Sequence, residues 1–289
     1  MKKLSPSAFG LLAPVHVLLL GVITLPSLYV FWMSLNESSY GVAPVFVGLS
    51  NYKTVLLDSY FWRAAFNTFV VVNAVVYAEI VLGLALALLF ASGLPCRKLM
   101  FAIVLMPYAV SEVVGVLAWK IIMNPNYGAI GRMLADWGMG LNWSASPTQG
   151  LVLVSVISVW HHLPFTFLLL YAGILAIPQS VYEAARIDGA NAIQMFFRIT
   201  LPLLIPALLI TVIFRLVFAF RMFSEVWLLT KGGPARLTEV LAVYLYQGAF
   251  RNGEFGTAAA TGWLMVLSSL AIASFYLYQM HRRIAVGNA

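Results

Sequence analysis

The most regular feature of this chain is a series of long apolar stretches separated by shorter polar segments. Each apolar stretch reaches or exceeds the roughly 20 residues that a helix needs to cross about 30 Å of hydrocarbon. Because lipid offers no partner to backbone N–H and C=O groups, each stretch must be helical. The pattern therefore predicts an all-α integral membrane protein with six spans. The predicted spans are residues 9–35, 66–91, 100–123, 151–174, 203–229 and 257–280.

The composition agrees with helices that face lipid, since 62% of the residues are hydrophobic and 9% are charged. A soluble domain carries about 25% charged residues, so this chain has too few charges for a surface in water. The net charge of +7 partly reflects Lys and Arg between the spans. Nucleic-acid binding is not expected, because the sequence has no basic soluble domain to hold a nucleic acid.

The distribution of Lys and Arg predicts the orientation of the spans. These residues are densest at the two ends of the chain, in the link that holds Arg97 and Lys98, and in the loop 176–202. Positively charged residues concentrate on the cytoplasmic side of a membrane protein, so both termini and this loop are expected in the cytoplasm. We divide the chain into a cytoplasmic stub, first span and outer loop (1–61), the remaining spans (62–280) and a cytoplasmic tail (281–289).

The loop between the fourth and fifth spans is longer and less polar than a simple connection needs to be. Ser180 followed by Glu183 forms a capping-box pattern, which predicts a short helix that starts at Ser180. Gly189 has the position of the residue that ends this helix. A second short helix is expected at 192–199, and Pro202 marks the entry to the fifth span. The loop is therefore predicted to be a helix–turn–helix that projects into the cytoplasm.

This helix–turn–helix has the features of a docking element. Ala184 and Ala185 are small enough to let another backbone come close, and Glu183 and Asp188 add an acid pair. An amphipathic helix of this kind docks into a groove of a partner protein. The alternative is a segment that lies on the inner leaflet, although such helices normally carry more Lys and Arg on their polar face.

The same loop carries a resemblance to a known family. Its motif, Glu183-Ala184-Ala185, Gly189 and Ile199-x-Leu201-Pro202, resembles the EAA loop of ATP-binding-cassette importer permeases. The flanking segments are similar to those of the carbohydrate-uptake, maltose-type branch, and the resemblance is strongest over residues 63–279. These segments are Leu105-Met106-Pro107-Tyr108, Trp119-Lys120, Asn124-Pro125-Asn126-Tyr127-Gly128, and Leu229-Thr230-Lys231-Gly232-Gly233-Pro234.

The resemblance implies the permease subunit of a binding-protein-dependent sugar or glycoside importer in a bacterial inner membrane, which works by alternating access. It also implies a second homologous permease, two ATP-binding-cassette ATPase subunits and an extracytoplasmic sugar-binding protein as partners, besides the lipid bilayer. ATP and Mg would bind to the ATPases, because this chain has no Gly-x4-Gly-Lys-Ser/Thr loop. We expect no cofactor on this chain and no enzymatic activity of its own. The predicted ATPase-coupling residues are Tyr182, Glu183, Ala184, Ala185, Asp188 and Gly189.

The resemblance places substrate contacts in the spans on either side of the loop. Phe165 and Phe218 could stack on a sugar face, and the polar side chains could bond its hydroxyl groups. Because Arg215 departs from the mostly neutral lining of the family, we hypothesise a small glycoside with a sulfonate or phosphate group held by the guanidinium fork. The predicted substrate-pathway residues are Ser158, His161, His162, Phe165, Arg215, Phe218, Ala219 and Met222.

Ionisable side chains within the predicted spans are energetically costly in a bilayer. Glu79, Glu112 and Arg215 fall near mid-depth. Arg221 and Glu225 are four residues apart, a spacing that lets them pair on one helix face. Two interpretations stay open: these groups neutralise one another between helices, or they belong to a transport pathway.

Three other functions compete with the importer. A secondary transporter would use the buried Glu and Arg side chains as ion sites, but it gives no reason for the EAA-like loop. A membrane enzyme would need a cluster such as HExxH, which the sequence lacks. A non-transporting scaffold would only recruit an ATPase. No metal site is expected at His161-His162, because neighbouring residues on a helix point about 100° apart.

Overall fold

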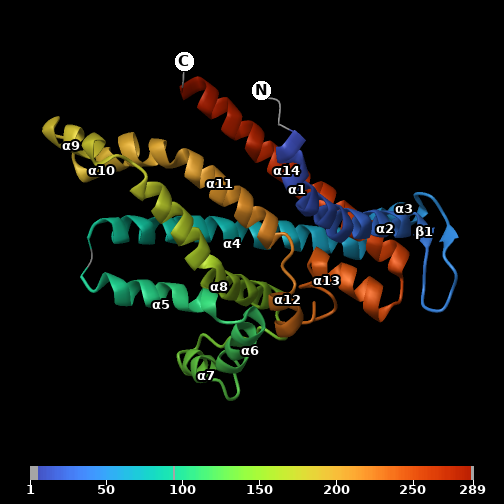
Figure 1. Ribbon diagram of the computed structural model, residues 1–289. Helices are drawn as coiled ribbons and strands as arrows, with labels where there is room; N and C mark the ends of the chain where they lie inside the picture. Colours follow the sequence, from blue (N-terminus) through green and yellow to red (C-terminus); the bar gives the residue numbers. More distant parts are fainter. Residues whose placement is uncertain (1–5, 94, 288–289) are drawn as a thin grey trace. The chain divides into compact units, whose positions relative to one another are not determined.

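The computed structural model of the protein describes residues 6–93 and 95–287 and is almost entirely helical (Figure 1). Single π-helical turns lie between α1 and α2 (η1, Leu20–Thr24), between α10 and α11 (η2, Phe196–Thr200) and after α13 (η3, Gln247–Arg251). The helices are α1 (Pro6–Leu19), α2 (Leu25–Ser34), α3 (Ser50–Leu57), α4 (Ser59–Ala91), α5 (Arg97–Ala109), α6 (Glu112–Ile122), α7 (Ala129–Asp136), α8 (Pro147–Leu175), α9 (Gln179–Ile187), α10 (Ala192–Met195), α11 (Leu201–Ala219), α12 (Ser224–Leu229), α13 (Leu241–Tyr246) and α14 (Phe255–Gly287).

Five helical stretches in the described residues are long and apolar enough to cross a membrane, and a sixth span results if the bent pair α5 and α6 is counted as one. This agrees with the predicted membrane class and leaves the number of spans at five or six. The five stretches are Ala13–Ser34, Ser59–Ala91, Pro147–Leu175, Ala192–Ala219 and Phe255–Tyr278.

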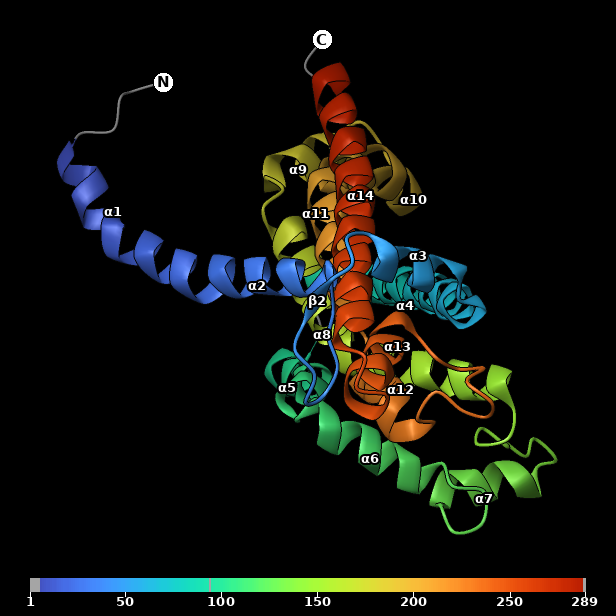
Figure 2. The ribbon, with the colours of Figure 1, turned by 90° about the vertical axis from the view of Figure 1, so that its right-hand side faces the viewer.

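The third predicted span is not one continuous helix, which corrects the prediction for residues 100–123. The axes of α5 and α6 meet at 96°, and Figure 2 shows α5 nearly along its axis and α6 from the side. Val110 and Ser111 have extended backbones at the bend. Pro107 precedes the bend, and a proline cannot donate the backbone hydrogen bond of a helix interior.

The fifth predicted span also differs from the structure. Its helix begins earlier, because α10 continues through η2 into α11 instead of ending at Ile199. It also ends earlier, at Ala219, and a separate short helix starts at Ser224. The predicted pairing of Arg221 with Glu225 on one helix face is therefore wrong, because only Glu225 lies on a helix.

The chain forms two compact units, and the first consists of residues 1–62 and 244–267. It contains a short antiparallel ribbon of β1 (Asn36–Glu37) and β2 (Val45–Phe46), which departs from the all-α prediction. The buried Asn51 side chain donates hydrogen bonds of 2.9 Å to two backbone carbonyl groups next to this ribbon. The domain boundaries predicted from the sequence, 61/62 and 280/281, were placed by the predicted spans. The first unit is defined instead by packing contacts, and it includes residues 244–267.

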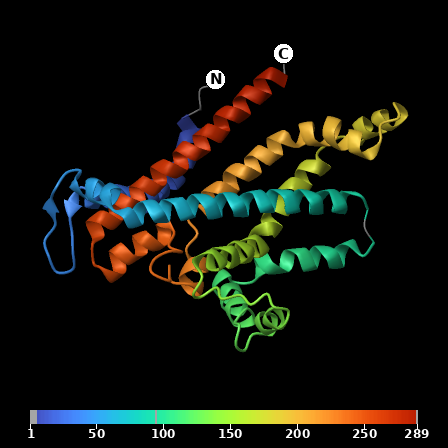
Figure 3. The same cartoon turned by 180° about the vertical axis from the view of Figure 1, so that it is seen from behind.

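The second unit consists of residues 63–243 and 268–289 and contains the candidate site. In this unit α8 packs against α5, α6, α11 and α12. Figure 3 shows α9 and α10 at one end of α11, whereas α12 is near the opposite end of α11. Small residues let the helices approach closely: a Cβ atom added to Gly173 would lie 2.7 Å from the Cβ atom of Ala207. The Asn67 side chain ties α4 to the loop before α13 by donating to the Leu237 and Glu239 carbonyl groups, each at 2.9 Å.

Candidate functional site

The predicted helix–turn–helix is present as a hairpin of α9, α10 and η2 (residues 179–200), but its caps differ from the prediction. α9 starts at Gln179 with Pro178 at the N-cap, so Ser180 lies inside the first turn and does not cap the helix. The capping box is instead on α10, where Asn191 and Gln194 exchange side-chain-to-backbone hydrogen bonds of 2.9 and 3.0 Å. This box satisfies two backbone N–H groups at the start of α10, the second helix of the hairpin.

The end of α9 agrees with the prediction for Gly189. This glycine has a φ angle of +76°, in the left-handed region. The Ala190 N–H bonds the Ala185 carbonyl at 2.9 Å, and the Gly189 N–H bonds the Arg186 carbonyl at 3.1 Å. These two bonds form a Schellman motif, which closes the helix and favours glycine because it has no Cβ atom. The hairpin therefore has a sharply defined corner.

The two faces of α9 separate the six predicted coupling residues. Four of them lie exposed on the outer face or at the corner, and Ile187, also on the outer face, is 86% exposed. Ala185 is buried, and the half-buried Tyr182 turns inward, where its hydroxyl group bonds the Thr200 Oγ1 atom at 3.1 Å. The exposed predicted residues are Glu183, Ala184, Asp188 and Gly189.

A polar cavity of about 550 Å³ lies beside α8 and α11. A smaller cavity of about 120 Å³ shares several residues with it and reaches α12. All eight predicted substrate-pathway residues line one or both of these cavities, which we call together the polar cavity. The larger is lined by Tyr108, Glu112, His161, His162, Phe165, Arg215, Phe218 and Arg221. The smaller adds Ser158, Ala219, Met222, Phe223, Ser224 and Glu225.

The guanidinium group of Arg215 forms an ion pair with the Glu79 carboxylate. Its Nε atom donates to Glu79 Oε2 and its Nη2 atom donates to Glu79 Oε1 at 2.6 Å. Thr166 donates a further hydrogen bond of 3.2 Å to Glu79. Glu79 is 0% exposed and Arg215 is 1% exposed. For these two residues the structure therefore agrees with neutralisation between helices, and the Arg215 fork already holds an internal carboxylate.

Aromatic rings form one side of the polar cavity. The Phe165 ring lies 6.2 Å from that of Tyr108 and 6.0 Å from that of Phe218, centroid to centroid. The Arg221 guanidinium group lies 5.6 Å from the Phe218 centroid. Aromatic faces of this kind bury the apolar face of a ligand ring and leave its polar edge to hydrogen-bonding groups. The cavity therefore combines stacking surfaces with polar groups.

Both rings of the histidine pair lie at the wall of the polar cavity. The rings of His161 and His162 are 4.8 Å apart with an angle of 84° between their planes. His162 Nδ1 lies 3.0 Å from the Ser158 carbonyl oxygen. No group of three or more metal-binding side chains occurs among the described residues.

Six cavity residues are not among the predicted substrate-pathway residues: Tyr108, Glu112, Arg221, Phe223, Ser224 and Glu225. Tyr108 and Glu112 reach the cavity because of the bend between α5 and α6, which the apolar pattern does not reveal. Arg221 lies in the break after α11 and is exposed. Glu225 is 2% exposed, and its Oε2 atom has no hydrogen-bond partner among the described residues. For Glu112, Arg221 and Glu225, an ionisable side chain within an apolar stretch was the available signal in the sequence.

Comparisons with known proteins give consistent results. The family model described as binding-protein-dependent transport system inner membrane component matches residues 79–286. The trehalose/maltose transport system permease protein MalF of Thermococcus litoralis is 35% identical over 269 residues, which are 92% of this chain and 91% of the relative. The trehalose transport system permease protein SugA of Mycobacterium tuberculosis is 31% identical over 282 residues, which are 97% and 90% of the two chains.

A solved structure has the same fold. It is a bacterial ABC transporter involved in the import of the acidic polysaccharide alginate, and it aligns with a TM-score of 0.82 at 22% identity. The alignment covers 95% of this chain and 94% of that chain.

Proposed function

Because this chain belongs to the family of binding-protein-dependent transport system inner membrane components, we propose that it forms half of the pathway of an ATP-driven sugar or glycoside importer. The relatives named for trehalose and maltose transport support a sugar as cargo. The polar cavity supports it too, because its larger part has a volume of about 550 Å³, within the roughly 300–1,000 Å³ of sites for drug-sized ligands. In this proposal the chain has no catalytic activity.

The proposed topology has six spans, with α5 and α6 as a bent third span. Both termini and the hairpin lie in the cytoplasm of a bacterial cell, because the segments that hold them are the richest in Lys and Arg. The polar cavity lies in the membrane part of the chain, away from the hairpin.

The proposed partners are a second homologous permease, two ATP-binding-cassette ATPase subunits and an extracytoplasmic sugar-binding protein. ATP and Mg bind to the ATPases. The exposed face of α9 supports ATPase docking, because Ala184 and Ile187 offer a small and an apolar contact between the acids Glu183 and Asp188. A basic groove on the ATPase would complement this face and set its register.

The observation that carries the proposal is the continuous helix between the hairpin and the polar cavity. Helical backbone runs unbroken from Ala192 to Ala219. Arg215 and Phe218, near its end, line the cavity. At about 1.5 Å per residue, a movement of the hairpin acts on the cavity over roughly 35 Å. ATPase closure would thus tilt α11 and alternate the access to the cavity.

The test is reconstitution of the full importer in vesicles. Uptake of labelled trehalose or maltose should require ATP, the ATPases and the binding protein together, and should persist when a protonophore collapses the proton gradient. Glu183→Arg should reduce ATPase retention and uptake, whereas Asp136→Arg, an exposed acid on α7, should change neither. Uptake that needs the proton gradient and not ATP would support a secondary transporter instead.

A further inference from the structure

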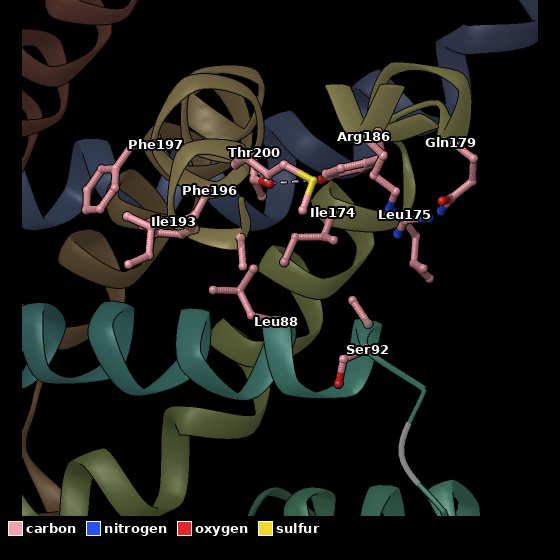
Figure 4. A pocket seen from close by; sticks show the side chains of 14 residues that line it. Leu88, Ser92, Ile174, Leu175, Gln179, Arg186, Ile193, Phe196, Phe197 and Thr200 are labelled. Atoms are coloured by element: carbon pink, nitrogen blue, oxygen red, sulfur yellow. Dashed lines mark hydrogen bonds between the residues drawn. The ribbon is translucent and has the colours of Figure 1, made fainter. Parts of the chain in front are cut away.

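A second cavity lies under the hairpin, at the other end of α11 from the polar cavity (Figure 4). Its volume is about 540 Å³, and its lining is mainly apolar. The end of α4 contributes Leu88 and the end of α8 contributes Ile174. The hairpin contributes Ile193 and Phe196 from its inner side. Neither the coupling face of α9 nor the polar cavity accounts for this space, which we call the hairpin cavity.

The hairpin cavity lies where two candidate spans end. The α4 span ends at Ala91 and the α8 span ends at Leu175, and both residues line the cavity. A span of this kind leaves the hydrocarbon near its last residues, so the cavity is at the boundary between acyl chains and headgroups. An apolar space at this depth is open to lipid.

Among the described residues that line the hairpin cavity, Arg186 is the one with a cationic side chain. The hydroxyl groups of Tyr182 and Thr200 bond each other at 3.1 Å. Arg186 lines the same cavity, and Figure 4 shows its side chain beside Leu175. No Asp or Glu among the described residues lines this cavity, and no ion pair of Arg186 occurs in the described part of the chain.

We propose that the hairpin cavity binds one anionic phospholipid, with its phosphate group on Arg186 and an acyl chain among Leu88, Ile174 and Phe196. The charge complementarity is specific, since a guanidinium group matches a phosphate with two parallel N–H donors. Basic pockets between spans on the cytoplasmic side bind anionic headgroups in this way. The bound lipid holds the inner side of the hairpin against α4 and α8, and so stiffens the element that the ATPases move.

Native mass spectrometry of the complete importer tests the proposal. The complex is purified from nanodiscs made of equal parts phosphatidylglycerol and phosphatidylcholine, and the retained lipids are counted. Wild type should retain phosphatidylglycerol preferentially. Arg186→Gln should reduce this retention about fivefold, which corresponds to about 1 kcal/mol for one Arg at an anionic surface. Arg198→Gln is the matched control, because Arg198 is an exposed Arg of the same hairpin outside the cavity.

A second variant keeps the charge and fills the space. Ala91→Phe should displace the acyl chain and lower phosphatidylglycerol retention as far as Arg186→Gln does, while size-exclusion chromatography shows that the ATPases remain bound. Unchanged retention in either variant would overturn the proposal, and so would an equal loss in Arg198→Gln. A photoreactive residue at position 91 should label lipid; labelling of the sister permease instead would make a protein segment the occupant. Retention is read without transport, so it stands apart from a failure of the importer assay.

Discussion

Replacing Arg215 by Met should strongly destabilise the protein, and replacing Glu79 by Leu at the same time should restore most of the loss. The two side chains are 1% and 0% exposed and hold each other through two charge-assisted hydrogen bonds. Removing one partner leaves the other charge buried and unpaired, which costs about 3–5 kcal/mol. Replacing both with apolar groups of similar volume is often neutral or stabilising by about 1–4 kcal/mol.

The assay is a double-mutant cycle on purified protein, unfolded by dodecyl sulfate in mixed micelles. Arg215→Met and Glu79→Leu should each lower the free energy of unfolding by about 3–5 kcal/mol, and the double variant should stay close to wild type. Losses that simply add in the double variant would refute the reasoning, because they would mean that the two side chains do not interact.

Uptake by the same variants separates the two interpretations of the buried charges. If Arg215 acts only through Glu79, the double variant should transport as well as it folds. If Arg215 also holds an anionic group of the cargo, the double variant should fold normally and still fail to take up a sulfonated or phosphorylated glycoside. A single Arg215→Met variant cannot make this distinction, because its loss of folding would hide any loss of binding.

Three further predictions concern local packing. Gly189→Ala forces an alanine to a φ angle of +76° and should cost roughly 1–2 kcal/mol, measured as a lower midpoint of thermal unfolding and relieved by Gly189→Asn relative to Ala. Gly173→Val would press against Ala207, whose Cβ atom is 2.7 Å from the added Cβ; it should lower the detergent stability of the complex, whereas the exposed Ala172→Val should not. Asn51→Ala leaves two backbone carbonyl groups without their donor and should cost about 1–3 kcal/mol, seen as faster proteolysis of the first unit; wild-type cleavage rates would contradict it.

Much of the architecture follows from residue type and from short-range order. The apolar stretches predict the membrane helices, because the cost of burying polar groups in lipid depends on composition over about 20 residues. Gly189 predicts the corner of the hairpin, because the backbone strain at a helix end is local to that residue. The EAA-like motif likewise indicated the family before any fold was known.

The breaks in the third and fifth spans could not be predicted in the same way. The residues at both breaks are largely apolar, such as Val110 and Phe220, so the hydrophobic pattern continues across them. The pairing expected for Arg221 and Glu225 failed for this reason, since it assumed an unbroken helix. The capping box predicted at Ser180 is wrong, because α9 begins one residue earlier, at Gln179 with Pro178 at its N-cap.

The sequence by itself determined that the long apolar stretches are largely helical, that they belong in a membrane and where the hairpin turns. Tertiary structure alone decided which charges meet: Glu79 and Arg215 are 136 residues apart and pair because α4 and α11 bring them to the same depth. The reason is that hydrophobicity and capping act between neighbours in the chain. An ion pair between helices depends on how each helix is rotated, where it bends and where it ends.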